Sequence, residues 1–136
     1  MKVVNQVTPS PEQAAAFFGG GEDGAFVMVN LLKFKPKAEY EDGSDADLSG
    51  AEAYARYGAA VQACIAAVGA KGVFSGAVTG LMLGEVEENW DMVAMVEYPT
   101  LASFQKMVSS PEYQAITHHR TAGLAGQLNI KTKPLG

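Results

Sequence analysis

Three consecutive residues, His118, His119 and Arg120, form the densest group of chemically active side chains in the sequence. A guanidinium binds carboxylates and other anions, and an imidazole gains or loses a proton near neutral pH. Neighbouring helix positions point about 100° apart, so one histidine at most would face a given cleft, and no i, i+4 histidine pair is available to chelate a metal. We therefore predict Arg120 as an anion-binding residue, His119 or His118 as a catalytic proton-transfer residue, and no metal site. The alternative is that these cations only complement the negative end of a helix dipole.

Four further residues could line the same cleft. Asn30 interrupts an apolar stretch, and its amide needs a hydrogen-bonding partner if it is buried. Tyr54 and Tyr57 lie one helical turn apart, so both could reach one pocket. Trp90 could add an apolar wall. Each of these residues also has a purely structural interpretation, as a bonded amide, two core tyrosines and a core tryptophan.

Other patterns in the sequence argue against nucleotide, calcium and nucleic-acid binding. Gly19-x-Gly21-x-x-Gly24 has the spacing of a dinucleotide fingerprint, but it follows a predicted helix and precedes a predicted strand, which is the reverse of the required order. Asp45-x-Asp47-x-Ser49 resembles the start of a calcium loop, but Arg56 stands where the bidentate carboxylate belongs. Lys and Arg number 10 against 15 Asp and Glu, and the resulting charge of −5 disfavours phosphate backbones. We expect no cofactor and no nucleic-acid partner.

Length and composition predict one domain over residues 1–136, with 48% hydrophobic and 18% charged residues. The single Cys64 cannot form an internal disulfide, and the first residues lack the apolar core of a secretory signal, so we expect a cytoplasmic location. The longest uncharged stretches, residues 57–70 and 72–84, are shorter than the roughly 18 apolar residues that suggest a membrane span. We therefore expect no membrane association.

Helix and strand signals alternate along the chain. Ser10 and Ser49 each precede a helical pattern and have a capping partner three residues later. The acidic segment 36–48 has little apolar periodicity and predicts an exposed loop of the kind that often acts as a lid. The expected elements are a short helix from Pro11, a strand over 25–33, a helix from Ser49 to near Gly69, strands over 72–84 and 90–98 joined by 85–89, a helix opened by Thr100 and restarted at Pro111 through about Ala122, and a last strand over 127–132.

After the first helix, the order β-α-β-β-α-β predicts an α+β fold, the ferredoxin-like sandwich with both helices on one face of an antiparallel sheet. In the strand over 25–33, apolar residues occupy both the odd- and the even-numbered positions, as Val27 and Val29 alternate with Phe26 and Met28. Both sheet faces are therefore predicted to be buried. A second copy of the chain is the simplest cover for the free face, so we predict a homodimer.

Several blocks of sequence together resemble a known family. They are Val29-Asn30-Leu31-Leu32-Lys33-Phe34, residues 49–58 (SGAEAYARYG), Trp90-Asp91, Glu97-Tyr98-Pro99, Ser110-Pro111-Glu112-Tyr113-Gln114 and His119-Arg120-Thr121-Ala122-Gly123-Leu124. In this order they resemble the bacterial domain-of-unknown-function family 1330 over about residues 25–131.

The resemblance implies a dimeric α+β barrel, in which two ferredoxin-like subunits pack sheet against sheet. It nominates positions without assigning roles: Asn30, Tyr54, Tyr57, Trp90, Asp91, His119 and Arg120. The wider superfamily contains cofactor-independent monooxygenases and isomerases, and no catalytic role transfers from it to single residues of this chain.

Two functions remain open on the sequence alone. The first is a small-molecule cleft for an anionic, partly aromatic metabolite, with cofactor-independent oxygenation or isomerisation as the associated chemistry. The second is a non-catalytic ligand-binding or dimerisation module in which the same residues serve the core and the helix ends.

Overall fold

A computed structural model describes residues 3–20 and 24–135 of the chain. Residues 21–23, the centre of the glycine-rich motif, lie outside the described part. The elements are α1 (Pro11–Phe18), β1 (Phe26–Phe34), α2 (Gly50–Ala67), β2 (Lys71–Ala77), β3 (Met92–Tyr98), α3 (Leu101–Ser109), α4 (Pro111–Gln114), α5 (Thr117–Gly123) and β4 (Leu124–Thr132).

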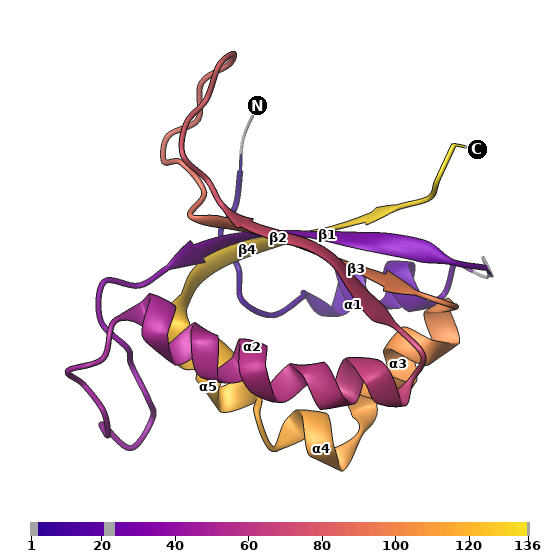
Figure 1. Cartoon of the computed structure of the whole chain (residues 1–136), viewed down its shortest axis with the longest axis horizontal. Helices are drawn as coiled ribbons and strands as arrows, with labels where there is room; N and C mark the ends of the chain where they lie inside the picture. Colours follow the sequence, from indigo (N-terminus) through magenta and orange to yellow (C-terminus); the bar gives the residue numbers. More distant parts are fainter. Residues whose placement is uncertain (1–2, 21–23, 136) are drawn as a thin grey trace.

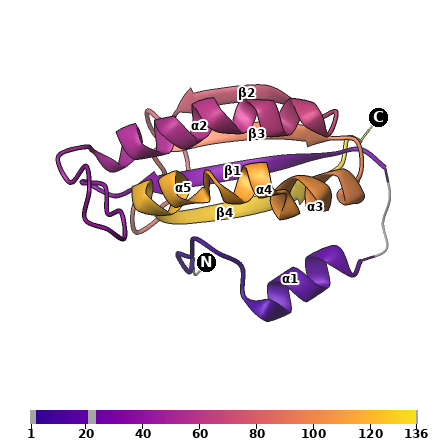
Figure 2. The ribbon, with the colours of Figure 1, turned by 90° about the horizontal axis from the view of Figure 1, so that it is seen from below.

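The four strands form one antiparallel sheet in the order β2-β3-β1-β4. Figures 1 and 2 show α2 across β2 and β3, and α3, α4 and α5 along β1 and β4, all on the same face of the sheet. The helix α1 lies on that side too, beyond the β4 edge. This arrangement confirms the predicted ferredoxin-like α+β fold.

Local signals explain where the helices begin. The side chains of Ser10, Ser49, Thr100 and Ser110 each accept a hydrogen bond from a backbone amide in the first turn of α1, α2, α3 and α4. Ser110 also ends α3, and Pro111 starts α4, so the predicted break falls at this proline.

The core lies between the sheet and the helices. Phe26, Met28 and Leu32 of β1 point toward the helices and are at most 3% exposed. Residues opposite one another in an antiparallel ladder share a face, so Tyr98 joins Phe26 in this core. Phe104 of α3 packs edge-on against both rings.

The other face of the sheet, which we call the outer face, carries no helix (Figure 1). Val27, Val29 and Leu31 of β1 alternate with the core residues and are only partly buried. On the strands at either edge, Phe74 and Ile130 are 54% and 43% exposed. A single chain therefore covers one face of the sheet and leaves an apolar second face in contact with water.

Several element boundaries differ from the sequence prediction. The strand predicted over 72–84 ends at Ala77, and the one predicted from Trp90 begins at Met92. The reason lies at Asp91, whose backbone amide donates to Leu32 and whose carboxylate accepts from the amide of Phe34, so the ladder ends there. The predicted second helix after Pro111 is divided into α4 and α5, and β4 begins at Leu124.

Most residues of the acidic loop over 36–48 are exposed, as predicted, but parts of the loop are docked on the rest of the chain. Ala38 is 4% exposed and packs with Ala53 and Ala122, and its amide donates to Leu48 across the loop. The amide of Glu39 donates to the carbonyl of Ala122. These backbone bonds dock the loop on α2 and α5, which local charge patterning does not predict.

No helix within the described residues is long and apolar enough to cross a membrane.

Candidate functional site

A large open cleft lies between the helices and the sheet. It encloses about 1750 Å³, more than the roughly 300–1,000 Å³ of a typical small-molecule pocket, so a ligand would occupy only part of it. Four of the residues nominated from sequence line it: Asn30, Tyr54, Tyr57 and Arg120. They come from β1, α2 and α5, so the fold brings together side chains that are far apart in the chain.

A chain of hydrogen bonds fixes the polar end of the cleft. Arg120 Nη2 donates to Gln127 Oε1, Gln127 Nε2 donates to Asn30 Oδ1 over 3.1 Å, and Asn30 Nδ2 donates to the carbonyl of Ala94 over 3.0 Å. A guanidinium only donates, so Gln127 must turn its oxygen to Arg120 and its NH₂ group to Asn30. Arg120 therefore sets the orientation of both amides.

Three tyrosines form the adjacent wall. The hydroxyls of Tyr57 and Tyr113 lie 3.0 Å apart, and the rings of Tyr54 and Tyr57 are 5.3 Å apart. Burial raises the pKa of Tyr54 to about 12, although the nearby Arg120 opposes the shift. Burial also raises the pKa of Tyr57, and Tyr113 adds to the effect. The hydroxyls of Tyr54 and Tyr57 are therefore neutral at pH 7 and act as hydrogen-bonding groups.

Two glycines set the distance between the helices that carry Tyr54 and Arg120. A Cβ atom on Gly123 would lie 2.3 Å from the carbonyl oxygen of Gly50 and 2.9 Å from the amide nitrogen of Tyr54. A Cβ on Gly50 would likewise lie 2.7 Å from the carbonyl oxygen of Gly123. Only glycine at both positions permits this backbone contact between α2 and α5.

Arg120 is the one charged residue among the described residues that line the cleft. In the described part of the chain it forms no ion pair, and the one hydrogen bond of its side chain is to Gln127. A guanidinium has five N–H donors, so most of them remain available to a ligand. The cleft is therefore positive at one end and apolar or aromatic along its walls.

The two histidines do not line this cleft. His119 Nδ1 lies 2.7 Å from the hydroxyl of Tyr40 in the acidic loop, and His118 is exposed with its ring 4.0 Å from that of His119. Burial lowers the pKa of His119, and His118 and Arg56 add to the effect. The structure thus places the predicted proton-transfer residues on the loop side of α5, apart from Arg120.

Trp90 and Asp91 also lie outside the cleft lining. Trp90 precedes β3 and is partly buried, and Asp91 holds the end of β1 through the amide of Phe34. The carboxylate of Asp91 is thus committed to the end of the sheet.

Sequence reasoning missed two members of the site, Gln127 and Tyr113. In the sequence, Gln127 stands out only as a polar residue in a strand of alternating apolar and polar residues. Tyr113 appears only within the block Ser110-Pro111-Glu112-Tyr113-Gln114 that resembles the family. Their importance comes from α4, α5 and β4 meeting over β1, which spacing alone does not reveal.

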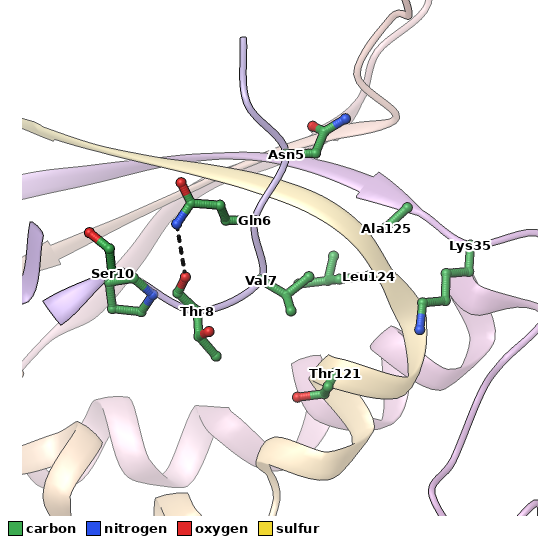
Figure 3. Close-up of a pocket in the computed structure, with 10 residues that line it drawn as sticks. Asn5, Gln6, Val7, Thr8, Ser10, Lys35, Thr121, Leu124 and Ala125 are labelled. Carbon is green, nitrogen blue, oxygen red and sulfur yellow. Dashed lines mark hydrogen bonds between the residues drawn. The ribbon is translucent and has the colours of Figure 1, made fainter.

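A smaller pocket lies beside the cleft, between the segment that leads into α1 and the end of α5. It encloses about 580 Å³, and Figure 3 shows its polar lining of Gln6, Thr8, Ser10 and Thr121 with Lys35 at one end. The Lys35 ammonium is already paired with Glu39 at 2.9 Å. Gln6 and Thr121 line both hollows.

Within residues 3–20 and 24–135, no three His, Cys, Asp or Glu side chains cluster as a metal site would require. Fold and cleft together define a ferredoxin-like α+β protein with a cleft on its helical side that carries an arginine at one end.

Comparison with known proteins gives the family. The profile of the domain of unknown function DUF1330 matches residues 44–131, and the chain belongs to this family. The RPA0582 protein of unknown function from Rhodopseudomonas palustris has a similar crystal structure, with 33% sequence identity and a TM-score of 0.88 over 98% of this chain and 99% of that one. No curated protein matches the chain.

More distant structures share the fold alone. A dimeric ferredoxin-like protein of unknown function from Bacteroides fragilis is 13% identical, with a TM-score of 0.55 over 82% of this chain and 97% of that one. Another from Thermobifida fusca is 14% identical, with a TM-score of 0.50 over 83% of this chain and 93% of that one.

Proposed function

We propose that the protein binds a small anionic metabolite with an aromatic or apolar body in the cleft. The observation that carries this proposal is Arg120, held by Gln127 and without a carboxylate partner in the described chain. An anion at the guanidinium would gain charge-assisted hydrogen bonds, and the tyrosine wall would contact the rest of the ligand.

We favour binding without proton-transfer catalysis. Cofactor-independent oxygenation or isomerisation needs a base that removes a proton from the substrate. The described lining contains no histidine or carboxylate, and the raised pKa values keep Tyr54 and Tyr57 protonated. Catalysis in this cleft would therefore depend on a substrate that ionises without help from those groups.

The test of the ligand class compares aromatic carboxylates with their neutral amides. We expect benzoate, phenylacetate or 4-hydroxybenzoate to raise the melting temperature more than benzamide, phenylacetamide or 4-hydroxybenzamide does, because a ligand at about 100 times its Kd stabilises the native state by about 2.7 kcal/mol. Arg120→Gln should remove the difference. Arg56→Gln is the matched control, since Arg56 pairs with Asp45 outside the cleft. Equal shifts from acids and amides, or full binding by Arg120→Gln, would refute the anion site.

We also propose that two copies associate through the outer face. The apolar outer face supports this assembly, as do the two structures of the same fold whose proteins are described as dimeric. The buried free Cys64 agrees with our proposal of a cytoplasmic location. Val29 lies at the centre of the outer face, opposite Met95 and Ile130. Val29→Glu should therefore shift the protein from dimer to monomer in sedimentation velocity, and a wild-type monomer at 100 μM would refute the dimer.

A further inference from the structure

The segment over residues 78–91, which we call the β2–β3 arm, carries the most exposed apolar cluster of the described chain. Leu81, Met82 and Leu83 are 51%, 103% and 87% exposed, and Val86 is 40% exposed. Three consecutive large apolar side chains in water are unfavourable, and such runs commonly mark a contact surface. We therefore expect the tip of the arm to contact a binding partner.

Hydrogen bonds fix the base of the arm. The amide of Val78 donates to the carbonyl of Asp91 over 3.0 Å, and the amide of Asp91 donates to Leu32 over 2.8 Å. Lys33 Nζ donates to the carbonyl of Asn89 over 2.9 Å. These bonds attach the returning segment of the arm to the end of β1 and the leading segment to the returning one, so the direction of the arm at its base is set by the sheet.

The arm rises on the side of the outer face, away from the helices (Figure 1). At up to about 3.3 Å per residue, the residues between Ala77 and Leu83 can reach about 20 Å from the sheet. Two sheets packed face to face lie only about 10 Å apart. The tip can therefore pass the sheet of a second copy and contact its side.

The charge of the arm separates a protein partner from a lipid surface. Glu85, Glu87 and Glu88 follow the apolar tip, and among the residues that the structure describes only Glu88 has a cation within ion-pair distance, Lys33 at 3.6 Å. Acidic residues are repelled by the negative surface of a cytoplasmic membrane leaflet. An apolar tip beside exposed carboxylates fits a protein surface better than an anionic bilayer.

We propose that the β2–β3 arm of one subunit clasps a second copy of the chain, with Leu81, Met82 and Leu83 packed against the partner beside its sheet. This inference rests on the proposed homodimer, and it adds a contact that sheet-to-sheet packing alone does not require. By two-fold symmetry each arm contributes once, so any change in the tip acts twice per dimer.

The first test compares the wild-type protein with the arm-tip variant, a control variant of the arm and Val29→Glu by sedimentation velocity over a dilution series. The arm-tip variant Leu81→Asn/Met82→Gln/Leu83→Asn keeps the side-chain sizes and removes the apolar surface. We expect its dimer Kd to rise at least about 100-fold, because burial of one leucine is worth about tenfold or more in an equilibrium constant and two arms are changed in each dimer. The control Glu85→Gln/Glu87→Gln alters the same arm beyond its tip and should stay within threefold of wild type.

The outcomes separate the clasp from the dimer. If Val29→Glu dissociates the protein while the arm-tip variant keeps the wild-type Kd, the dimer stands and the clasp is wrong. If the wild-type protein is a monomer at 100 μM, the proposed dimer fails and the clasp with it. Circular dichroism should show both arm variants folded, since the substituted arm residues are exposed.

The second test places the photo-crosslinker p-benzoylphenylalanine at Met82. Irradiation should join two chains, and mass spectrometry of a mixed isotope-labelled dimer should assign the cross-link between subunits. The same crosslinker at Ala55, an exposed residue of α2, serves as the control position. Cross-links confined to one chain would overturn the clasp, as would tip-dependent sedimentation with phosphatidylserine vesicles, which would assign the tip to a membrane.

Discussion

Replacement of Gly123 by alanine should destabilise the protein by separating α2 from α5. The added Cβ would lie 2.3 Å from the carbonyl oxygen of Gly50, and real Cβ atoms keep at least about 3.0 Å from such atoms. This oxygen and the amide nitrogen of Tyr54, the next nearest atom, both belong to the backbone. The clash therefore cannot be relieved by the rotation of a side chain. The helices must move apart by at least about 0.7 Å at this point.

The expected loss follows from two opposing effects. Forcing a methyl group into a closely packed site costs typically about 1–3 kcal/mol, and the backbone contact places Gly123→Ala near the upper end. Alanine recovers up to about 1 kcal/mol through its higher helix propensity. The net loss is about 2 kcal/mol, which lowers the melting temperature by about 6–10 °C in a domain of this size.

Gly58→Ala provides the matched control. Gly58 lies in the middle of α2, and nothing lies within 4 Å of the position its Cβ would take. Helix propensity should then dominate and raise the melting temperature by about 2–4 °C. Both variants are measured by calorimetry at one protein concentration, because association makes the melting temperature depend on concentration. Equal or higher stability of Gly123→Ala would refute the close-contact argument.

Three further changes probe the cleft and its surroundings. Tyr57→Phe and Tyr113→Phe should each cost about 1 kcal/mol in urea denaturation, and the double variant should cost little more, because the two hydroxyls share one hydrogen bond. Gln127→Glu gives Arg120 an internal carboxylate, so titration calorimetry should show at least a tenfold loss of affinity for an aromatic carboxylate that wild type binds. The lowered pKa of His119 means that the unfolded chain takes up this proton first, so stability should fall as pH decreases through about 6.5. His119→Gln should flatten that fall between pH 8 and 5.5, and an unchanged slope would contradict the assignment.

Elements with strong local signals were predictable from the sequence. Ser49 and Glu52 form the expected capping box at the start of α2, and β1 falls within one residue of its predicted range. The strand β2 ends early because its partner β3 begins only at Met92, next to Asp91, which holds the end of β1 in a contact between segments far apart in the chain. An apolar run shows that a segment can form a strand, whereas the partner strand decides where pairing stops.

The site residues could be predicted where the sequence shows which side of a helix faces the cleft. Tyr54 and Tyr57 follow the regular period of α2, so their common direction could be read from spacing. The phase of His118, His119 and Arg120 depends on the new start of α5 after Ile116, where no side chain caps the helix. Without that start the sequence could not show that Arg120 turns to the cleft while His119 turns to Tyr40.

The two proposed surfaces lie on opposite faces of one strand. Along β1, Asn30 points to the cleft, and Val29 and Leu31 point to the outer face, because successive side chains in a strand alternate. Ligand binding and subunit association can therefore be altered independently by substitutions one residue apart. Val29→Glu should remove the dimer and leave the bonds among Arg120, Gln127 and Asn30 in place, since these lie on the helical side. Loss of both properties in that variant would mean that the cleft is formed only in the assembled protein.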